Sequence, residues 1–124
     1  MLSAIDPAAI GATLEETWSP RVVAELDDSY VKVARIQGGF GWHSHPAEDE
    51  LFLVLRGCMR LEMAHGTVEL KQGELFVVPK GARHAPSADA DCLILLVEKK
   101  TTLHGGDTDN PRARSIASQL QAPG

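Results

Sequence analysis

Alternation of apolar and polar residues governs most of this chain. Between about residue 20 and residue 100 the apolar residues recur at alternate positions in seven short runs, most of them separated by glycine, proline or aspartate. A period of two belongs to β-strands with one buried face, and such separators mark tight turns. The sequence therefore predicts an all-β fold, built as an antiparallel sandwich or barrel. The predicted strands are 22–26, 30–37, 51–55, 59–64, 67–70, 75–78 and 92–98.

The chain before and after these strands follows other patterns. Asp6 suits a helix N-cap, Pro7 suits the first helical position, and Ile10 and Leu14 follow at helical spacing. We therefore expect a short helix over about residues 6–16, followed by the barrel over about residues 20–100. From His104 onward the periodicity disappears, so residues 104–124 are expected to form an irregular tail. The 124 residues make one domain of ordinary size.

Charge and hydropathy exclude two classes of partner. Twelve Lys and Arg face seventeen Asp and Glu, and no basic stripe stands out, so we expect no nucleic-acid partner. The longest apolar runs are strand-sized, far below the roughly 20 residues of a membrane helix, so we expect no membrane partner. The N-terminal segment has no basic stretch, and Cys58 and Cys92 are interpreted as buried free thiols. These features predict a cytoplasmic protein.

A histidine-rich stretch carries the chemistry that the sequence suggests. His43 and His45 are two residues apart, and in an extended strand that spacing points both imidazoles to the same side. Glu50 follows at the start of the predicted strand 51–55. If that strand pairs with the segment that carries the histidines, its carboxylate returns to the same side. A third histidine, His84, follows a second turn, and imidazoles with a carboxylate suit a divalent transition metal.

The spacing of these residues resembles that of the cupin family. The run from Gly38 to Gly57 contains His-x-His, four residues, Glu, six residues and Gly, which is similar to the first cupin motif. The run from Gly73 to His84 contains Gly, five residues, Pro, x, Gly, two residues and His, which is similar to the second. The fifteen residues between Gly57 and Gly73 resemble the linker of compact bacterial single-domain cupins. The flanks look like a subgroup labelled mannose-6-phosphate-isomerase-like.

This resemblance implies a jelly-roll barrel, the cupin double-stranded β-helix, with a short N-terminal helix before it. His43, His45, Glu50 and His84 would point inward and hold one divalent metal ion, with two positions open to water or substrate. Manganese, iron, nickel, zinc and copper all tolerate such a set of ligands, so the identity of the ion stays open. His65, in a predicted hairpin turn, and His104, in the tail, are expected at the surface rather than in the metal site.

The strand after Glu50 predicts a partner subunit. If Glu50 points inward, Phe52 and Val54 line the pocket, and the row of Leu51, Leu53 and Leu55 points outward. A monomer would expose that apolar row, so it predicts burial against a second subunit. Cupins commonly provide one, and we therefore expect a homodimer.

Two functions compete at this stage. The first is a metal-dependent enzyme that acts on a small organic or sugar-like substrate, of isomerase, lyase or oxygenase type (a dioxygenase, for example). The second is a non-catalytic metal cupin module that binds a small ligand or a sugar. The predicted ligands do not choose between them, and no catalytic residue beyond the metal is predicted.

Overall fold

The computed structural model describes residues 2–120, and within that range seven strands are flanked by two short helices. The elements, in chain order, are α1 (Pro7–Thr13), β1 (Arg21–Leu26), β2 (Ser29–Gly39), β3 (Glu50–Arg56), β4 (Cys58–Met63), β5 (Gly66–Lys71), β6 (Leu75–Val78), β7 (His84–Lys99) and α2 (Ile116–Gln119). No described helix has the length and apolar character needed to cross a membrane.

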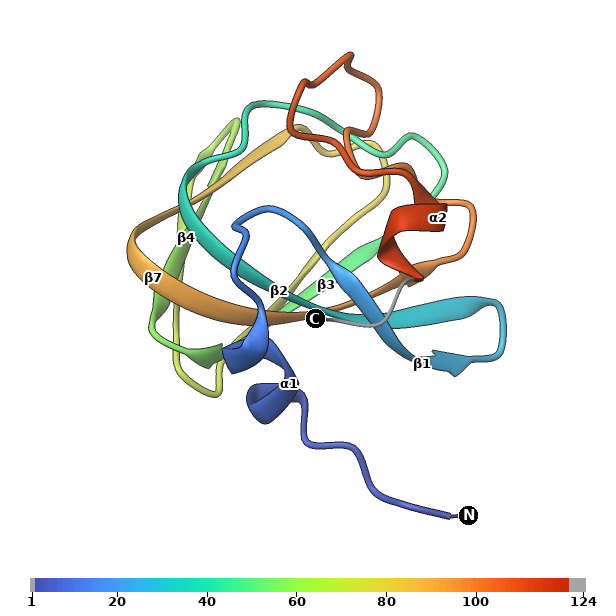
Figure 1. Ribbon diagram of the computed structural model, residues 1–124. Coiled ribbons are helices and arrows are strands. Elements are labelled where there is room, and N and C mark those ends of the chain that lie inside the picture. The colour runs from blue at the N-terminus through green and yellow to red at the C-terminus, as the bar shows by residue number, and fades with distance from the viewer. Residues whose placement is uncertain (1, 121–124) are drawn as a thin grey trace.

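The strands form one antiparallel sheet that curls into a barrel (Figure 1). The strand order is β1-β2-β7-β3-β6, and β4 joins β7 to β5. The long strand β7 belongs to both halves: Ser87 pairs with Arg60 of β4, whereas Leu96 pairs with Lys32 of β2 and with Phe52 of β3. The predicted all-β jelly-roll barrel with a short N-terminal helix is confirmed.

The last strand is longer than predicted. The sequence places it at 92–98, but β7 already begins at His84, and its first residues pair with β4. The expected loop was inferred from Pro86, which lacks an N–H for a sheet ladder. Here the carbonyl of Pro86 accepts a hydrogen bond from the N–H of Phe40 at 3.1 Å, so the strand uses only the group that proline retains.

The helical segments also differ from expectation. The carboxylate of Asp6 caps α1 by accepting from the N–H of Ala9 at 3.1 Å, as predicted, but the helix ends at Thr13 rather than near residue 16. The chain turns extended at Leu14, whose N–H donates to Gly11 instead of continuing the helical ladder. The tail, expected to be irregular, contains the single turn α2, and its residues 121–124 lie outside the described part of the chain.

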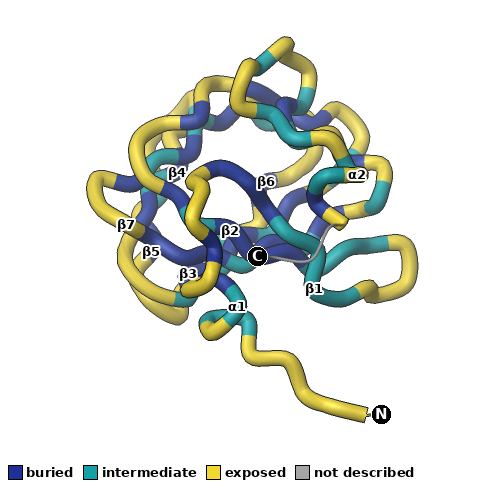
Figure 2. Tube along the Cα trace, viewed as in Figure 1, coloured by how far each residue is buried: buried dark blue, intermediate teal, exposed yellow. Residues whose placement is uncertain are grey.

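Alternation along the strands separates an inner and an outer face. Phe52 and Val54 of β3 are buried inside the barrel, as expected, and Figure 2 shows buried residues throughout the strands. Leu51, Leu53 and Leu55 alternate with them and are only half-buried. Helix α1 packs beside this outer face, so the outward row is less exposed than the sequence suggested.

Candidate metal centre

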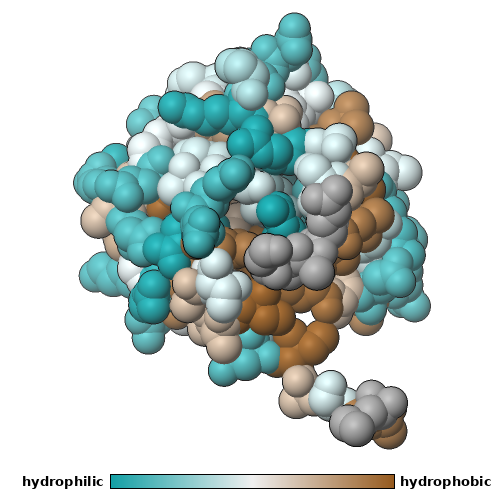
Figure 3. All heavy atoms as spheres, in the orientation of Figure 1, coloured by the Kyte–Doolittle hydropathy of each residue, from teal (hydrophilic) through white to brown (hydrophobic). Residues whose placement is uncertain are grey.

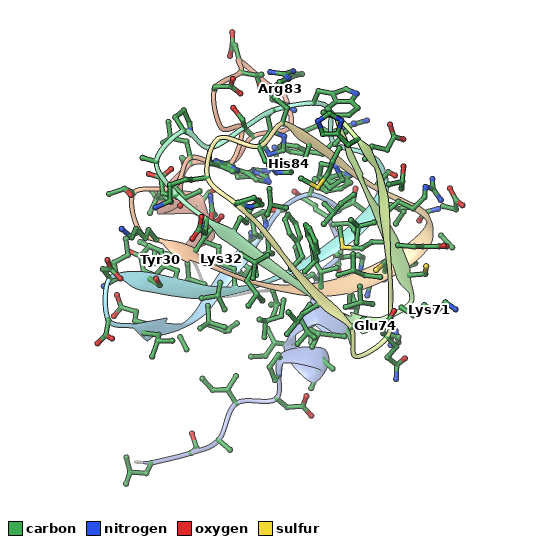
Figure 4. The ribbon with its side chains drawn as sticks, turned by 180° about the vertical axis from the view of Figure 1, so that it is seen from behind. Tyr30, Lys32, Lys71, Glu74, Arg83 and His84 are labelled. Carbon is green, nitrogen blue, oxygen red and sulfur yellow. The ribbon has the colours of Figure 1, made fainter. Side chains whose placement is uncertain are left out.

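The four side chains predicted as ligands come together inside the barrel. One ligand atom from each of His43, His45, Glu50 and His84 lies within 4.8 Å of all the others. Glu50 Oε1 is 3.4 Å from Nε2 of both His45 and His84. All four residues are buried, with relative exposures of 6% or less. Figure 4 shows His84 within the barrel, on the far side from the helix α1.

Backbone pairing positions the histidines. The N–H of His43 donates to the carbonyl of His84 at 3.0 Å, and the N–H of His84 donates back at 2.9 Å, so the two segments form an isolated antiparallel bridge. His45 lies two residues further along the same segment. Glu50 opens β3, between Val78 of β6 and Glu98 of β7 in the register of the sheet. The sheet therefore presents the carboxylate, and the bridge presents the imidazoles.

Hydrogen bonds to backbone carbonyls fix which ring nitrogens are free. Nδ1 of His43 lies 3.0 Å from the carbonyl of Gly41, and Nδ1 of His84 lies 3.0 Å from the carbonyl of Ala82. A carbonyl oxygen only accepts, so Nδ1 carries the proton in both rings and Nε2 keeps its lone pair. This second-layer contact is usual for a metal-binding histidine.

Unpartnered acceptors at the centre of the cluster fit a cation. Within the described chain, Nε2 of His45, Nε2 of His84 and Oε1 of Glu50 are buried without a hydrogen-bond partner. Burying such atoms without a partner is costly, and a bound cation would satisfy all of them at once. The buried His/Glu cluster therefore fits a divalent metal ion.

The electrostatics of the cluster favour the protonation states that bind metals. Burial lowers the pKa of His43 to about 4, so the imidazole is neutral near pH 7. Burial alone would raise the pKa of Glu50, but its close contacts with Glu98, His45 and His84 outweigh burial and hold that pKa well below its usual range. Burial, with the nearby charge of Glu50, raises the pKa of Glu98 well above normal.

Three buried polar residues that were not predicted from the sequence, Glu98, Lys32 and Gln119, contact one another in turn, beginning next to Glu50. Glu98 of β7 pairs with Glu50 on the neighbouring strand β3, and Lys32 Nζ is 2.7 Å from Glu98 Oε1. Lys32 also donates to Gln119 Oε1 at 2.5 Å. Lys32 shares a strand face with Ala34, and Glu98 shares one with Leu96. A charged residue on an otherwise apolar strand face was therefore the sequence feature that could have indicated these two buried groups. No local pattern points to Gln119.

A cavity inside the barrel adjoins the cluster. It is a narrow cavity, and one side of it is open to solvent. Its polar lining includes His43, Glu50, Lys32 and Glu98. Its apolar lining includes Trp18, Ile36, Phe40, Phe52, Ile94 and Leu96.

The two remaining histidines lie in different environments. His65 is exposed, as expected. His104 was expected at the surface, but it lines the cavity and its ring lies 4.6 Å from that of Phe40, centroid to centroid. The tail after β7 folds back over the barrel and carries His104 to this place, which a segment without periodicity does not reveal.

Comparison with known proteins agrees with this fold. A family model for the cupin domain (Cupin_2) matches residues 30–98. The uncharacterized protein YdbB of Bacillus subtilis (strain 168) is 32% identical over 93 residues, which span 74% of this chain and 82% of YdbB.

Two solved structures resemble the whole barrel. A cupin-2 domain containing protein from Shewanella frigidimarina NCIMB 400 is 34% identical, with a TM-score of 0.75 over 77% of this chain and 94% of that one. Protein NMB1881 from Neisseria meningitidis is 26% identical, with a TM-score of 0.71 over 79% of this chain and 100% of that one. The cupin barrel expected from the two motifs is confirmed by these matches.

Proposed function

The chain belongs to the cupin family, and from that premise we propose that it binds one divalent transition-metal ion through His43, His45, Glu50 and His84. The observation that carries the proposal is the set of buried, unpartnered Nε2 and Oε1 atoms that face one another in the cluster. Three imidazoles and one carboxylate leave coordination positions open on most such ions. The ion itself remains one of manganese, iron, nickel, zinc or copper.

The proposed activity is that of a metal-dependent enzyme on a small organic or sugar-like molecule, of isomerase, lyase or oxygenase type. A bound metal would supply a Lewis acid at the open positions. The chain itself would hold the substrate in the cavity, which the apolar side chains of Phe52 and Leu96 line beside His43. Sugar phosphates are one substrate class to test, because the flanks look like the mannose-6-phosphate-isomerase-like subgroup.

A non-catalytic module that binds a small ligand or sugar at the same metal is the second candidate. The pairing of Lys32 with Glu98 favours it, because these two charged side chains line the cavity but bind each other. Turnover by metal-loaded protein on sugar phosphates, dicarbonyls and phenols separates the two functions. Saturable binding without turnover supports the module.

We also propose a homodimer built on the outer face of the barrel. Leu51 and Leu53 pair with Val77 and Leu75 of β6, and the last two are 42% and 58% exposed. On the face of the molecule that Figure 3 shows, hydrophobic residues gather around α1. A second subunit would cover such surface. Light scattering that gives a monomer at micromolar concentration would contradict the dimer.

A cytoplasmic location is proposed as well. Its support is that Cys58 and Cys92 are both free of disulfides, as is usual in a reducing compartment. Cys92 is buried, as expected, whereas Cys58 is exposed, contrary to expectation.

Elemental analysis of protein purified without a chelating tag tests the metal directly. We expect about one transition-metal ion per chain, bound within ~2.0–2.2 Å of the four ligand atoms. An anomalous-scattering peak at the cluster in a crystal would locate it. Wild-type protein that takes up no divalent ion at pH 7 would overturn the proposal.

A further inference from the structure

The tail after β7 brings one more histidine to the cavity. Residues 104–119, called the C-terminal arm here, cross the barrel and are drawn in orange to red in Figure 1. His104, at the start of this arm, lines the same cavity as His43 and Glu50. It does not belong to the four-residue cluster of candidate ligands.

The backbone fixes the tautomer of His104. The N–H of Arg114 donates to Nδ1 of His104 at 2.8 Å. A backbone N–H can only donate, so Nδ1 is the acceptor and the ring proton sits on Nε2. Burial lowers the pKa of His104 to about 4, which keeps the ring neutral. With one nitrogen occupied and the other protonated, His104 has no lone pair for a metal and one N–H to donate.

That donor has no protein partner in the described chain. Nδ1 is the only His104 ring atom with a hydrogen bond among residues 2–120. His104 lines one cavity together with Glu50, Lys32 and His43, so the ring adjoins the candidate metal centre. A polar N–H beside a largely apolar cavity is suited to a ligand atom that accepts a hydrogen bond.

The arm holds this ring in place by contacts to the segment that carries the metal-site histidines. Asp107 accepts from the N–H of Ser44 at 2.8 Å and donates its own N–H to the carbonyl of Ser44 at 3.0 Å. The side chain of Asn110 donates to the carbonyl of Phe40 at 2.7 Å, and the Phe40 ring stacks on His104. The donor is therefore preorganised relative to His43 and His45.

We propose that His104 is a ligand-binding residue whose Nε2–H donates a hydrogen bond to an oxygen of a small molecule held at the open positions of the metal. The ligand class is a compact carboxylate, carbonyl or phenolate compound, whose apolar body packs against Trp18, Ile36 and Ile94. This inference rests on the proposed metal site. It gives the C-terminal arm a role in selecting the ligand, and none in holding the metal.

The test uses full-length protein loaded with Co²⁺ and titrated with benzoate, followed by the visible absorption of the ion. The variant His104→Phe keeps an aromatic ring against Phe40 and removes the donor. We expect it to bind Co²⁺ like the wild type and benzoate about tenfold more weakly, the range for a lost hydrogen bond to a charged group. His104→Gln, which retains an N–H, should bind benzoate within about threefold of the wild type. His65→Phe, at an exposed histidine, is the matched control and should change nothing.

Binding of imidazole shows whether His104→Phe weakens a ligand by removing a hydrogen-bond donor or by disturbing the cavity in general. It coordinates a metal through one nitrogen and presents an N–H at the other, so it offers His104 no acceptor. His104→Phe should therefore leave imidazole affinity unchanged. Equal benzoate affinity in the wild type and His104→Phe overturns the inference, and so does a His104→Gln variant as weak as His104→Phe. Loss of Co²⁺ in His104→Phe would make His104 a metal ligand and also overturn it. Failure of the wild type to bind Co²⁺ overturns the proposed function itself.

Discussion

The two halves of the candidate metal centre are built in different ways. Glu50 lies in a strand that is paired on both sides, with Val78 on one and Glu98 on the other. His43 and His45 lie between strands. Their segment is held by the bridge to His84, by a hydrogen bond from the N–H of Gly81 to the carbonyl of His45 at 2.9 Å, and by the C-terminal arm. The position of Glu50 thus depends on the sheet, whereas the positions of His43 and His45 depend on contacts with residues far along the sequence, near His84 and in the C-terminal arm. Loss of a sheet contact should therefore affect folding, and loss of an arm contact should affect the site.

The largest expected effect lies on the imidazole half. The double variant His43→Ala, His84→Ala removes two of the four ligands and should lose most of the bound metal. The barrel should still fold, because its core is apolar and its strands pair without an ion. Metal content by elemental analysis and secondary structure by circular dichroism measure the two outcomes. His65→Ala is the control, and unchanged metal in the double variant would contradict the assignment.

On the carboxylate half, the buried ion pair should dominate stability. Lys32 is 1% exposed and Glu98 5%, with 2.7 Å between Nζ and Oε1. Lys32→Met would leave two carboxyl groups, those of Glu98 and Glu50, close together without a cation. Breaking a buried pair from one side typically costs about 3–5 kcal/mol in the free energy of unfolding. Urea denaturation measures it, and the double variant Lys32→Met, Glu98→Gln should recover part of the loss. A loss below about 1 kcal/mol would show that the pair is unimportant.

The same difference explains what could be predicted from sequence. Alternation determines which side chains of a strand face inward, so the positions of Glu50, Phe52 and Val54 follow once the strand is recognised. The two-residue spacing of His43 and His45 predicts that they share a side, whereas the place of His84 beside them was expected only from the resemblance to the cupin motifs. Figure 4 shows Lys32 on its strand. It shares the inner face with Ala34 by the period of two, but a lysine there was not singled out from the sequence.

The contacts of the C-terminal arm could not be predicted in this way. His104 and Gln119 reach Phe40 and Lys32 across the barrel, and no periodicity links residues so far apart in the chain. Their positions depend on turns such as the one at Gly106, where an added Cβ would collide with the carbonyl oxygen of Ser44. The close approach of Gly106 to Ser44 depends on the tertiary structure, so it could not be predicted from the local sequence.

Acid should weaken the metal-free protein through the histidines that burial keeps neutral. The pKa of His104 is about 4 in the folded protein, against about 6.5 when it is unfolded. The unfolded chain therefore takes up a proton as the pH falls below 6.5, and the folded chain does not do so until about pH 4. The contribution of His104 to stability should fall across that window and then level off below it.

His104→Phe isolates this contribution. Its free energy of unfolding, measured by urea denaturation from pH 7 to pH 4, should fall less steeply than that of the wild type. The part of the slope that remains comes from other groups, His43 among them, whose pKa is also lowered to about 4 by burial. Identical slopes in the two proteins would mean that His104 is not buried in the neutral form.

The smallest expected effect is that of Gln119, where the two halves meet. Its Oε1 accepts from Lys32, and its Nε2 donates to the carbonyl of Arg114 at 2.9 Å. Gln119→Leu keeps the volume but removes both hydrogen bonds, and Lys32 retains Glu98 as its partner. We therefore expect a loss of about 1 kcal/mol in urea denaturation, below that of Lys32→Met. If Gln119→Leu costs as much as Lys32→Met, the arm supports the sheet and the two halves are not separate. Ser118→Ala, one residue away at the surface of α2, provides the comparison.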